Sequence, residues 1–360
     1  MSDAMRVAII GAGHLGTFHA RVLARLRPGQ PSWIVDLDEP KAAGLAAEVG
    51  ARATADLSLA LAAADAAIVA TPTETHAAVA TAALAAGCHV LVEKPLTATV
   101  AEGAALVDRA RAARRVLRVG HVERFNPVFQ AVRAEIVAPA FVEAERLAPF
   151  VPRSLDVDIV LDLMIHDLDL LLHIVPAPIE SIDAVGVPVL TPREDIATAR
   201  LRFTNGVVAN LTASRVSQEK SRKIRFFSRN AYHSLNLLAR SARRVAVAAD
   251  PQGEIVVPGV GTFRVHEERW ERKAPDPLSA EIAAFLDAAA GIPAPGVTGE
   301  EALRVLETAI EIRGHVRAGL ARLASQGLAP GARPGSPRPE SRPAPAAGAP
   351  SSSPWPPRAS

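Results

Sequence analysis

Short apolar runs alternate with longer Ala- and Leu-rich segments over residues 6–120, and the longer segments carry their charges at helical spacing. This rhythm is typical of β-α-β units under a parallel sheet. It predicts buried strands at residues 7–10, 33–35, 67–70, 90–92 and 117–119, and helices that begin near residues 15, 39, 57, 74 and 99. We therefore expect an α/β domain with a doubly wound parallel sheet over residues 1–122.

The rhythm changes after Gly120, where the sequence predicts a different kind of domain. The pattern indicates helices at residues 127–137, 158–174, 278–290 and 300–323, an extended run at 141–147, and β-rich sequence to about residue 265. Runs at 197–203, 207–213 and 223–227 predict a meander with an Asn205-Gly206 hairpin between the first two. Thr298 and Glu301 have the spacing of a capping box. We expect an α+β domain with an open, mostly antiparallel sheet over residues 123–328.

The end of the chain has a different composition. Residues 330–360 hold 10 of the 29 prolines and, apart from Trp355, almost no large apolar side chain. Such a segment cannot offset its ordering entropy by burial, so we expect a disordered tail over residues 329–360. Its four arginines and one glutamate carry +3, which leaves −1 for the rest of a chain with net charge +2. This balance, without a basic recognition helix, speaks against a nucleic-acid partner.

A single cysteine, Cys88, excludes an internal disulfide and a multi-cysteine zinc site, and it fits a reducing compartment. The N-terminus lacks the features of a signal peptide, and no apolar run approaches the ~20 residues that span a bilayer. We expect a cytoplasmic protein without membrane insertion, and we expect Cys88 to be a small packed residue.

A glycine-rich turn follows the first predicted strand and reads Gly11-Ala12-Gly13-His14-Leu15-Gly16. In this context Gly11 permits a tight turn, Gly13 lets backbone amides approach a pyrophosphate, and Gly16 permits close helix packing. Asp36 ends the second predicted strand 20 residues after Gly16. Its carboxylate favours NAD over NADP, because it can bind ribose hydroxyls and would repel a 2′-phosphate. Helix capping is the alternative role for Asp36.

Two further motifs end predicted strands at the edge where doubly wound sheets bind ligands. Thr71-Pro72-Thr73-Glu74-Thr75-His76 follows the strand at 67–70, and cofactor contact and helix capping by Thr73 are both open for it. Glu93-Lys94-Pro95 follows the strand at 90–92. A lysine beside an oxidised, cationic nicotinamide would be pushed toward its neutral form, which suits proton transfer.

The predicted helix at 158–174 carries Asp162, His166 and Asp169 at spacings of four and three, so the three side chains share nearly one face. An imidazole steered by a carboxylate is a recurring general base. A solvated helix face and a metal site are the alternatives. Nothing else in the sequence supports a metal, and nicotinamide dehydrogenases need none.

Together these motifs, in this order and at these separations, resemble the Gfo/Idh/MocA oxidoreductases, and the resemblance covers residues 5 to 325. It implies an N-terminal Rossmann domain that holds NAD(P) and a C-terminal domain whose open sheet contacts substrate and other subunits. It further implies that Lys94 contacts nicotinamide ribose and the substrate hydroxyl, that His166 accepts the proton and that Asp162 orients His166. Asp169 is then structural. The implied cofactor-binding residues are Gly11, Gly13, His14, Leu15, Gly16, Asp36, Thr71, Pro72, His76, Glu93 and Lys94.

A narrower likeness lies in the strings around residues 119–127 and 158–167, which are similar to family members that oxidise C3 of UDP-N-acetylglucosamine for lipid A synthesis. It implies a sugar-nucleotide substrate bound by Lys94, His166, His121 and Arg124. Arg124 has two open roles, since it could meet a diphosphate or form a structural salt bridge. Ser214-Arg215 and Ser221-Arg222-Lys223 are basic too, and we interpret them as a solvated sheet face or a subunit contact.

We therefore expect an NAD-dependent sugar-nucleotide dehydrogenase that forms a homodimer or homotetramer through its C-terminal sheet. Two alternatives stay open at this point. One is the same chemistry on myo-inositol or a free sugar, and the other is a catalytically inactive, NAD-binding regulatory protein.

Overall fold

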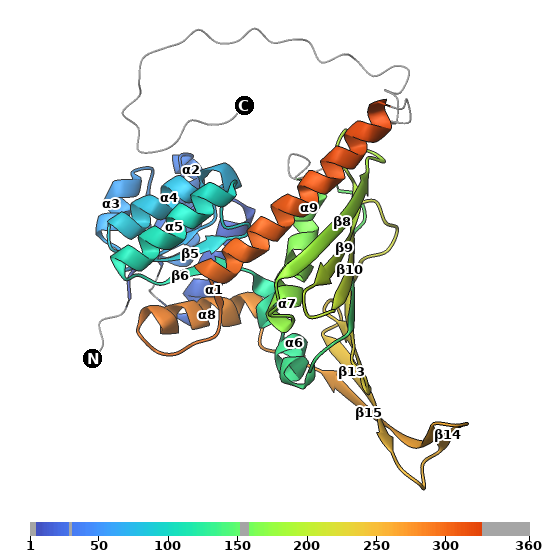
Figure 1. Cartoon of the computed structure of the whole chain (residues 1–360). Helices are drawn as coiled ribbons and strands as arrows, with labels where there is room; N and C mark the ends of the chain where they lie inside the picture. The colour runs from blue at the N-terminus through green and yellow to red at the C-terminus, as the bar shows by residue number, and fades with distance from the viewer. Residues whose placement is uncertain (1–4, 29–30, 152–157, 326–360) are drawn as a thin grey trace.

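Two β-sheets organise the computed structural model, which describes residues 5–28, 31–151 and 158–325 (Figure 1). In these residues the first sheet has seven strands in the order β16-β6-β5-β4-β1-β2-β3, and the second has nine in the order β14-β15-β13-β12-β11-β7-β10-β9-β8. The first sheet is parallel except for its edge strand β16. The second is antiparallel except between β7 and β10. Both sheet types are as the sequence predicts.

The first sheet follows the β-α-β alternation seen in the sequence. Its strands are β1 (Val7–Ile10), β2 (Pro31–Val35), β3 (Arg52–Thr54), β4 (Ala66–Val69), β5 (His89–Glu93) and β6 (Leu117–Gly120). Its helices are α1 (His14–Leu26), α2 (Glu39–Val49), α3 (Leu57–Ala62), α4 (Thr73–Ala85) and α5 (Val100–Ala113). The sequence reasoning missed β3, because this three-residue edge strand is mostly exposed and carries no apolar run.

Helices cover both faces of this sheet, and successive residues of each buried strand point to opposite faces. In β1, Ala8 and Ile10 pack with α3, α4 and α5, whereas Val7 and Ile9 pack with α1 and α2. This double burial explains why the strands are continuous apolar runs in the sequence.

Among the described residues, the helices that pack on the second sheet lie on one side of it (Figure 1). Its strands are β7 (Phe141–Leu147), β8 (Ile179–Val187), β9 (Ile196–Phe203), β10 (Val208–Ser214), β11 (Ser221–Phe227), β12 (Ala231–Asn236), β13 (Ser241–Ala249), β14 (Ile255–Val257) and β15 (Gly261–Glu271). The helices of this part of the chain are α6 (Pro127–Val132), α7 (Ile165–Ile174), α8 (Pro277–Ala289) and α9 (Gly299–Ser325), of which α8 packs against the first domain. The strand order leaves an open sheet, which the sequence also predicts.

The predicted meander is partly wrong. The hairpin between β9 and β10 is present, and Gly206 supplies its positive φ of 85°. The third run, β11, does not pair with β10, because β7 lies between them and pairs with both. A strand can be recognised from its own residues. Which strand it pairs with depends on contacts across about 80 residues of chain, which periodicity does not encode.

The predicted helix at 158–174 is not uniform. A π-helical turn (Val160–Met164) precedes α7, so the segment that carries Asp162 is wider than an α-helix. Such turns occur often at functional sites. The capping box before α9 is confirmed, since the Glu301 amide donates to the Thr298 hydroxyl and the Thr298 amide donates to the Glu301 carboxylate.

The chain returns to the first sheet near its end. β16 (Val297–Thr298) pairs with β6, and Ile282 and Phe285 of α8 pack in the same apolar cluster as β1 and α1. The domain expected over residues 123–328 is therefore not one continuous unit in space. The tail expected over residues 329–360 lies outside the described residues. In the described part of the chain, no helix is both long and apolar enough to cross a membrane.

Candidate active site

The glycine-rich turn joins β1 to α1, and two of its glycines leave no room for a side chain. Gly11 has φ +100°, and a Cβ there would lie 2.5 Å from the Ala70 carbonyl oxygen. A Cβ on Gly16 would lie 1.7 Å from the Gly11 carbonyl oxygen. Gly13 differs, because apart from its chain neighbours no atom of the described residues lies within 4 Å of its Cβ position. The turn is thus packed on its protein side and open where Gly13 lies.

The open side of the turn has the features that a dinucleotide needs. α1 begins at His14, and its N-cap Gly13 offers no side-chain acceptor to the first amides of the helix. Such amides, together with the helix dipole, bind phosphate. Leu15 and Phe18 on the first turns of α1 are both 44% exposed. The residues therefore fit the pyrophosphate of a dinucleotide.

Asp36 lies beside this turn. Its carboxylate accepts hydrogen bonds from the Ala12 amide at 2.7 Å and the Asp38 amide at 2.9 Å. The helix-capping role belongs instead to Asp38, whose side chain accepts from the Lys41 amide at the start of α2. Asp36 therefore occupies the position in which an acidic residue can bind the ribose of NAD.

His76 connects the loops that follow β4 and β5. Its Nδ1 lies 2.9 Å from the Pro95 carbonyl oxygen and its Nε2 lies 2.9 Å from the Thr71 carbonyl oxygen. Burial lowers the pKa of His76. α4 is capped by Pro72 without a side-chain hydrogen bond, so Thr73 does not cap it as the sequence alternative suggested. His76 thus lies between two loops at the carboxyl edge of the sheet, and its neutral imidazole donates its one N–H to one of the two carbonyls.

Lys94 and His166 meet at a cavity of about 260 Å³. The cavity is lined by Leu15, Phe18, His19, Glu93, Lys94, Gly120, Val122, His166 and Leu278. Nζ of Lys94 donates to the Asp162 backbone carbonyl at 2.7 Å and lies 3.5 Å from the Asp162 carboxylate. Behind the lysine, the Glu93 carboxylate lies 2.7 Å from Nε2 of His19. The cavity therefore joins the start of α1 and the residues that follow β5 with the helix that carries His166.

His166 is held in its neutral form, the form that can accept a proton. Burial, followed by the positive charges of Lys94 and Arg146, lowers its pKa well below the usual range, so the imidazole is neutral. Its Nδ1 is buried and has no hydrogen-bond partner within the described residues. The Asp162 carboxylate contacts Lys94 here, and none of the contacts found in the described chain joins it to His166. The role of Asp162 in orienting His166 stays a prediction.

An ion-pair cluster behind His166 escaped the sequence reasoning. Arg146 makes two 2.9 Å hydrogen bonds to Asp167 and one of 3.0 Å to Glu123. The same Glu123 oxygen accepts from Arg222 at 3.1 Å. A signal was present, because Arg146 occupies an inward position of β7, in phase with buried Val142 and Ala144. A charged residue at such a position needs buried partners.

The two residues expected to bind substrate just past β6 are both buried. His121 is 1% exposed, its two ring nitrogens have no partner among the described residues, and burial lowers its pKa to about 3. Arg124 lies 2.8 Å from Asp169 and 3.3 Å from Glu301. The structure thus favours the salt-bridge alternative for Arg124, because its guanidinium is enclosed by carboxylates. Asp169 holds Arg124 in place, in keeping with a structural role.

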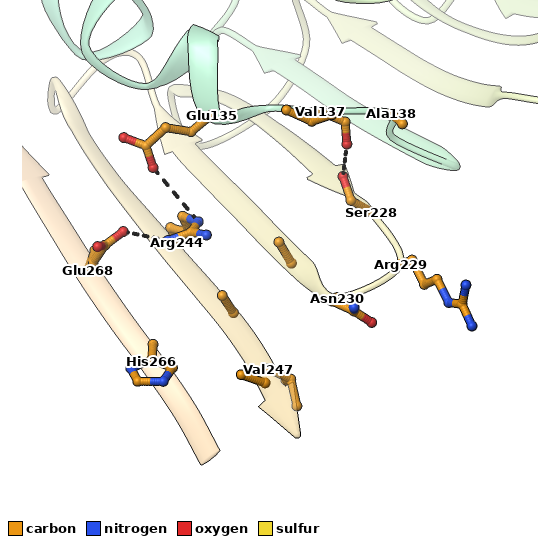
Figure 2. Close-up of a pocket in the computed structure, with 13 residues that line it drawn as sticks. Glu135, Val137, Ala138, Ser228, Arg229, Asn230, Arg244, Val247, His266 and Glu268 are labelled. Atoms are coloured by element: carbon orange, nitrogen blue, oxygen red, sulfur yellow. Dashed lines mark hydrogen bonds and ion pairs between the residues drawn. The ribbon is translucent and has the colours of Figure 1, made fainter. Parts of the chain in front are cut away.

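A larger hollow of about 580 Å³ lies at the far end of the second sheet, and Figure 2 shows its lining. Arg244 is held there between Glu268 at 2.8 Å and Glu135 at 3.7 Å. None of the residues expected to bind cofactor or substrate lines this hollow.

In the described chain, no group of three or more His, Cys, Asp or Glu side chains could hold a metal ion. Burial raises the pKa of Cys88 to about 11, as for a packed thiol.

The open glycine turn, Asp36 and the cavity that joins Lys94 to His166 define a nicotinamide-dependent oxidoreductase with a Rossmann domain. Residues 5–121 match the oxidoreductase family with an NAD-binding Rossmann fold, and residues 130–231 match the GFO/IDH/MocA C-terminal domain. The chain belongs to the Gfo/Idh/MocA family of oxidoreductases and has its NAD-binding fold.

Several proteins with similar sequences or folds are named as dehydrogenases. A UDP-N-acetylglucosamine 3-dehydrogenase from Acidithiobacillus ferrooxidans is 42% identical over 319 residues, which cover 88% of this chain and 99% of the relative. Its solved structure has a TM-score of 0.80 at 41% identity and covers 88% of this chain and 98% of its own. An inositol 2-dehydrogenase from Leifsonia xyli is 34% identical over 55% of this chain and 60% of its own length. A scyllo-inositol dehydrogenase from Lactobacillus casei, solved with NAD(H) and scyllo-inositol, shares the fold at 17% identity (TM-score 0.70, covering 88% of this chain and 98% of its own).

Proposed function

We propose that this protein oxidises the C3 hydroxyl of UDP-N-acetylglucosamine to a ketone with NAD. The observation that carries the proposal is the meeting of Lys94 and His166 at one cavity, beside the glycine turn that fits a dinucleotide. The 42% identical relative, which is named for this reaction, supports the choice of substrate over inositol.

The chain's own residues would handle the proton of the reaction. The neutral imidazole of His166 takes the proton of the sugar hydroxyl, and the low pKa keeps the imidazole available at neutral pH. Lys94, held by the Asp162 carbonyl, donates a hydrogen bond to the same oxygen and positions it. NAD supplies the acceptor for the hydride that leaves the carbon.

A substrate comparison tests the proposal. Purified protein with NAD is given UDP-N-acetylglucosamine, free N-acetylglucosamine or myo-inositol, and NADH formation is followed by absorbance. We expect turnover with the sugar nucleotide to exceed that with the other two by at least about a hundredfold in kcat/KM, a difference of about 3 kcal/mol. Turnover on inositol alone would overturn the assignment, and tight NAD binding without turnover on any substrate would favour a regulatory protein.

Several broader features belong to the same proposal. The 3-keto product is a substrate for an amino-group transfer, which fits lipid A synthesis in the cytoplasm. The open face of the second sheet, away from α7 and α9, provides a surface for a homodimer or homotetramer (Figure 1). Light scattering at micromolar concentration distinguishes these states from a monomer.

A further inference from the structure

Arg222 lies on the covered face of the second sheet, on the same side as the active-site helix. It pairs directly with Arg146 across the β7–β11 ladder, so both side chains point to the same face. Ile224 and Phe226, at the following alternate positions of β11, are buried in the core beneath α7. The sequence interpretation of Arg222 as part of a solvated face is therefore wrong.

Arg146 and Arg222 are neutralised to different degrees. Arg146 is 3% exposed and engages both oxygens of Asp167, the residue next to His166. Arg222 has a side chain that is 38% exposed and shares a single oxygen of Glu123 with Arg146. Only Nη1 of Arg222 is engaged by a described residue, so its Nε and Nη2 remain for a ligand. A guanidinium fork of this kind suits a phosphate group.

Arg222 is linked to the reacting end of the site through its neighbours, because it shares Glu123 with Arg146 and Arg146 binds Asp167, the residue that follows His166. Its charge contributes to the lowering of the His166 pKa, together with Lys94 and Arg146. His166 and Lys94 mark the position of the reacting hydroxyl. A substrate whose sugar ring lies there must place its anionic part nearby, and Arg222 is a partly exposed cation on that side of the sheet.

We infer that Arg222 binds the diphosphate of the substrate, and so selects a nucleotide sugar over an uncharged polyol. The inference rests on the proposed function. A phosphate oxygen accepts hydrogen bonds from Nε and Nη2, while Glu123 keeps the guanidinium oriented through Nη1. Because an uncharged polyol has no anionic group to offer, it gains nothing from this contact.

Binding of UDP separates this role from catalysis. The affinity of UDP for the NADH-loaded enzyme is measured by calorimetry for the wild type and for Arg222→Gln, Arg222→Lys and Arg225→Gln. Arg225 is the matched control, because it lies on the opposite face of β11, pairs with Glu143 and is similarly exposed at 31%. We expect Arg222→Gln to weaken UDP tenfold to a hundredfold and to raise KM for the nucleotide sugar similarly, with kcat within about threefold. Arg225→Gln should stay within twofold in both.

The remaining readouts make the result unambiguous. Uridine, which lacks phosphate, should bind wild type and Arg222→Gln equally, and thermal melting checks that the variants fold. If Arg222→Gln does not fold, Arg222→Lys keeps the charge but loses the fork, and a UDP affinity within twofold of wild type overturns the inference. Tight, Arg222-dependent UDP binding without turnover on UDP-N-acetylglucosamine would contradict the proposed function alone. Turnover on that sugar nucleotide with no dependence of UDP affinity on Arg222 would contradict this inference alone.

Discussion

Nζ of Lys94 donates a 2.7 Å hydrogen bond to the backbone carbonyl of Asp162, and this bond joins the loop after β5 to the π-helical turn before α7. The lysine of the Rossmann domain is therefore positioned by a segment of the second domain. The cavity at which Lys94 and His166 meet is complete only when the two domains are packed together.

Replacing Lys94 by Met should reduce kcat by a factor of about 10² to 10⁴, because the substrate hydroxyl loses a hydrogen-bond donor at the reacting oxygen. NADH affinity, measured by fluorescence titration, should change by less than about threefold. Lys223→Met on the open face of the sheet is the control and should retain wild-type turnover. Near-normal turnover of Lys94→Met would remove Lys94 from the mechanism.

The glycine turn gives two opposite outcomes for one added methyl group. Gly16→Ala places a Cβ 1.7 Å from a backbone oxygen and should destabilise the fold by about 3 kcal/mol or more. Gly13→Ala has open space and an extended backbone with φ −72°, so its melting temperature should be unchanged while NAD affinity falls at least tenfold. Retention of NAD affinity in Gly13→Ala would show that the pyrophosphate does not lie at this turn.

Asp36 and Asp38 separate cofactor choice from helix capping. Asp36→Ala should weaken the binding of NADH. It should also narrow the difference in affinity between NADH and NADPH, because the carboxylate that repels a 2′-phosphate is gone. Asp38→Ala should leave that difference intact and lower the free energy of unfolding by about 1 kcal/mol through loss of the N-cap. Fluorescence titration with both cofactors and urea denaturation provide the measurements, and an unaltered cofactor preference in Asp36→Ala would contradict the assignment.

The activity should be insensitive to mild acid. Since burial, Lys94 and Arg146 lower the pKa of His166 well below 6.5, the base stays unprotonated where an exposed histidine would be half charged. We expect kcat/KM for oxidation to stay level from about pH 8 to about pH 6. A decline centred near pH 6.5 would mean that His166 titrates normally or is not the base.

The stability should fall in acid, and His121 should account for part of the loss. Its pKa of about 3 in the folded state lies below the ordinary value of 6.5, so the unfolded chain takes up a proton first as the pH falls. The contribution of neutral His121 to the free energy of unfolding is complete above about pH 6.5. It decreases below that pH, by about 2 kcal/mol at pH 5. Urea denaturation of His121→Leu at pH 7 and pH 5 should show a smaller loss than the wild type. Equal losses would contradict this account.

Much of the first domain was predictable because its information is local. Strands buried on both faces are apolar runs, and the glycines at positions 11 and 16 meet steric limits that few other residues satisfy. Asp36, Lys94 and His166 were likewise recognisable in the sequence as candidate site residues, because they follow strands or lie on a helix at characteristic spacings.

The sequence alone thus determined the Rossmann alternation and the Asn-Gly hairpin, since each depends on neighbours a few positions away, and it indicated which residues are candidates for the cofactor and proton chemistry. Only the tertiary structure decided that β7 separates β10 from β11, that α8 and β16 return to the first sheet, and which arginine is free for a ligand. Arg124 and Arg222 look alike as sequence. Arg124 is enclosed by Asp169 and Glu301, whereas Arg222 retains solvent access, because burial and pairing depend on segments that meet only in the folded chain.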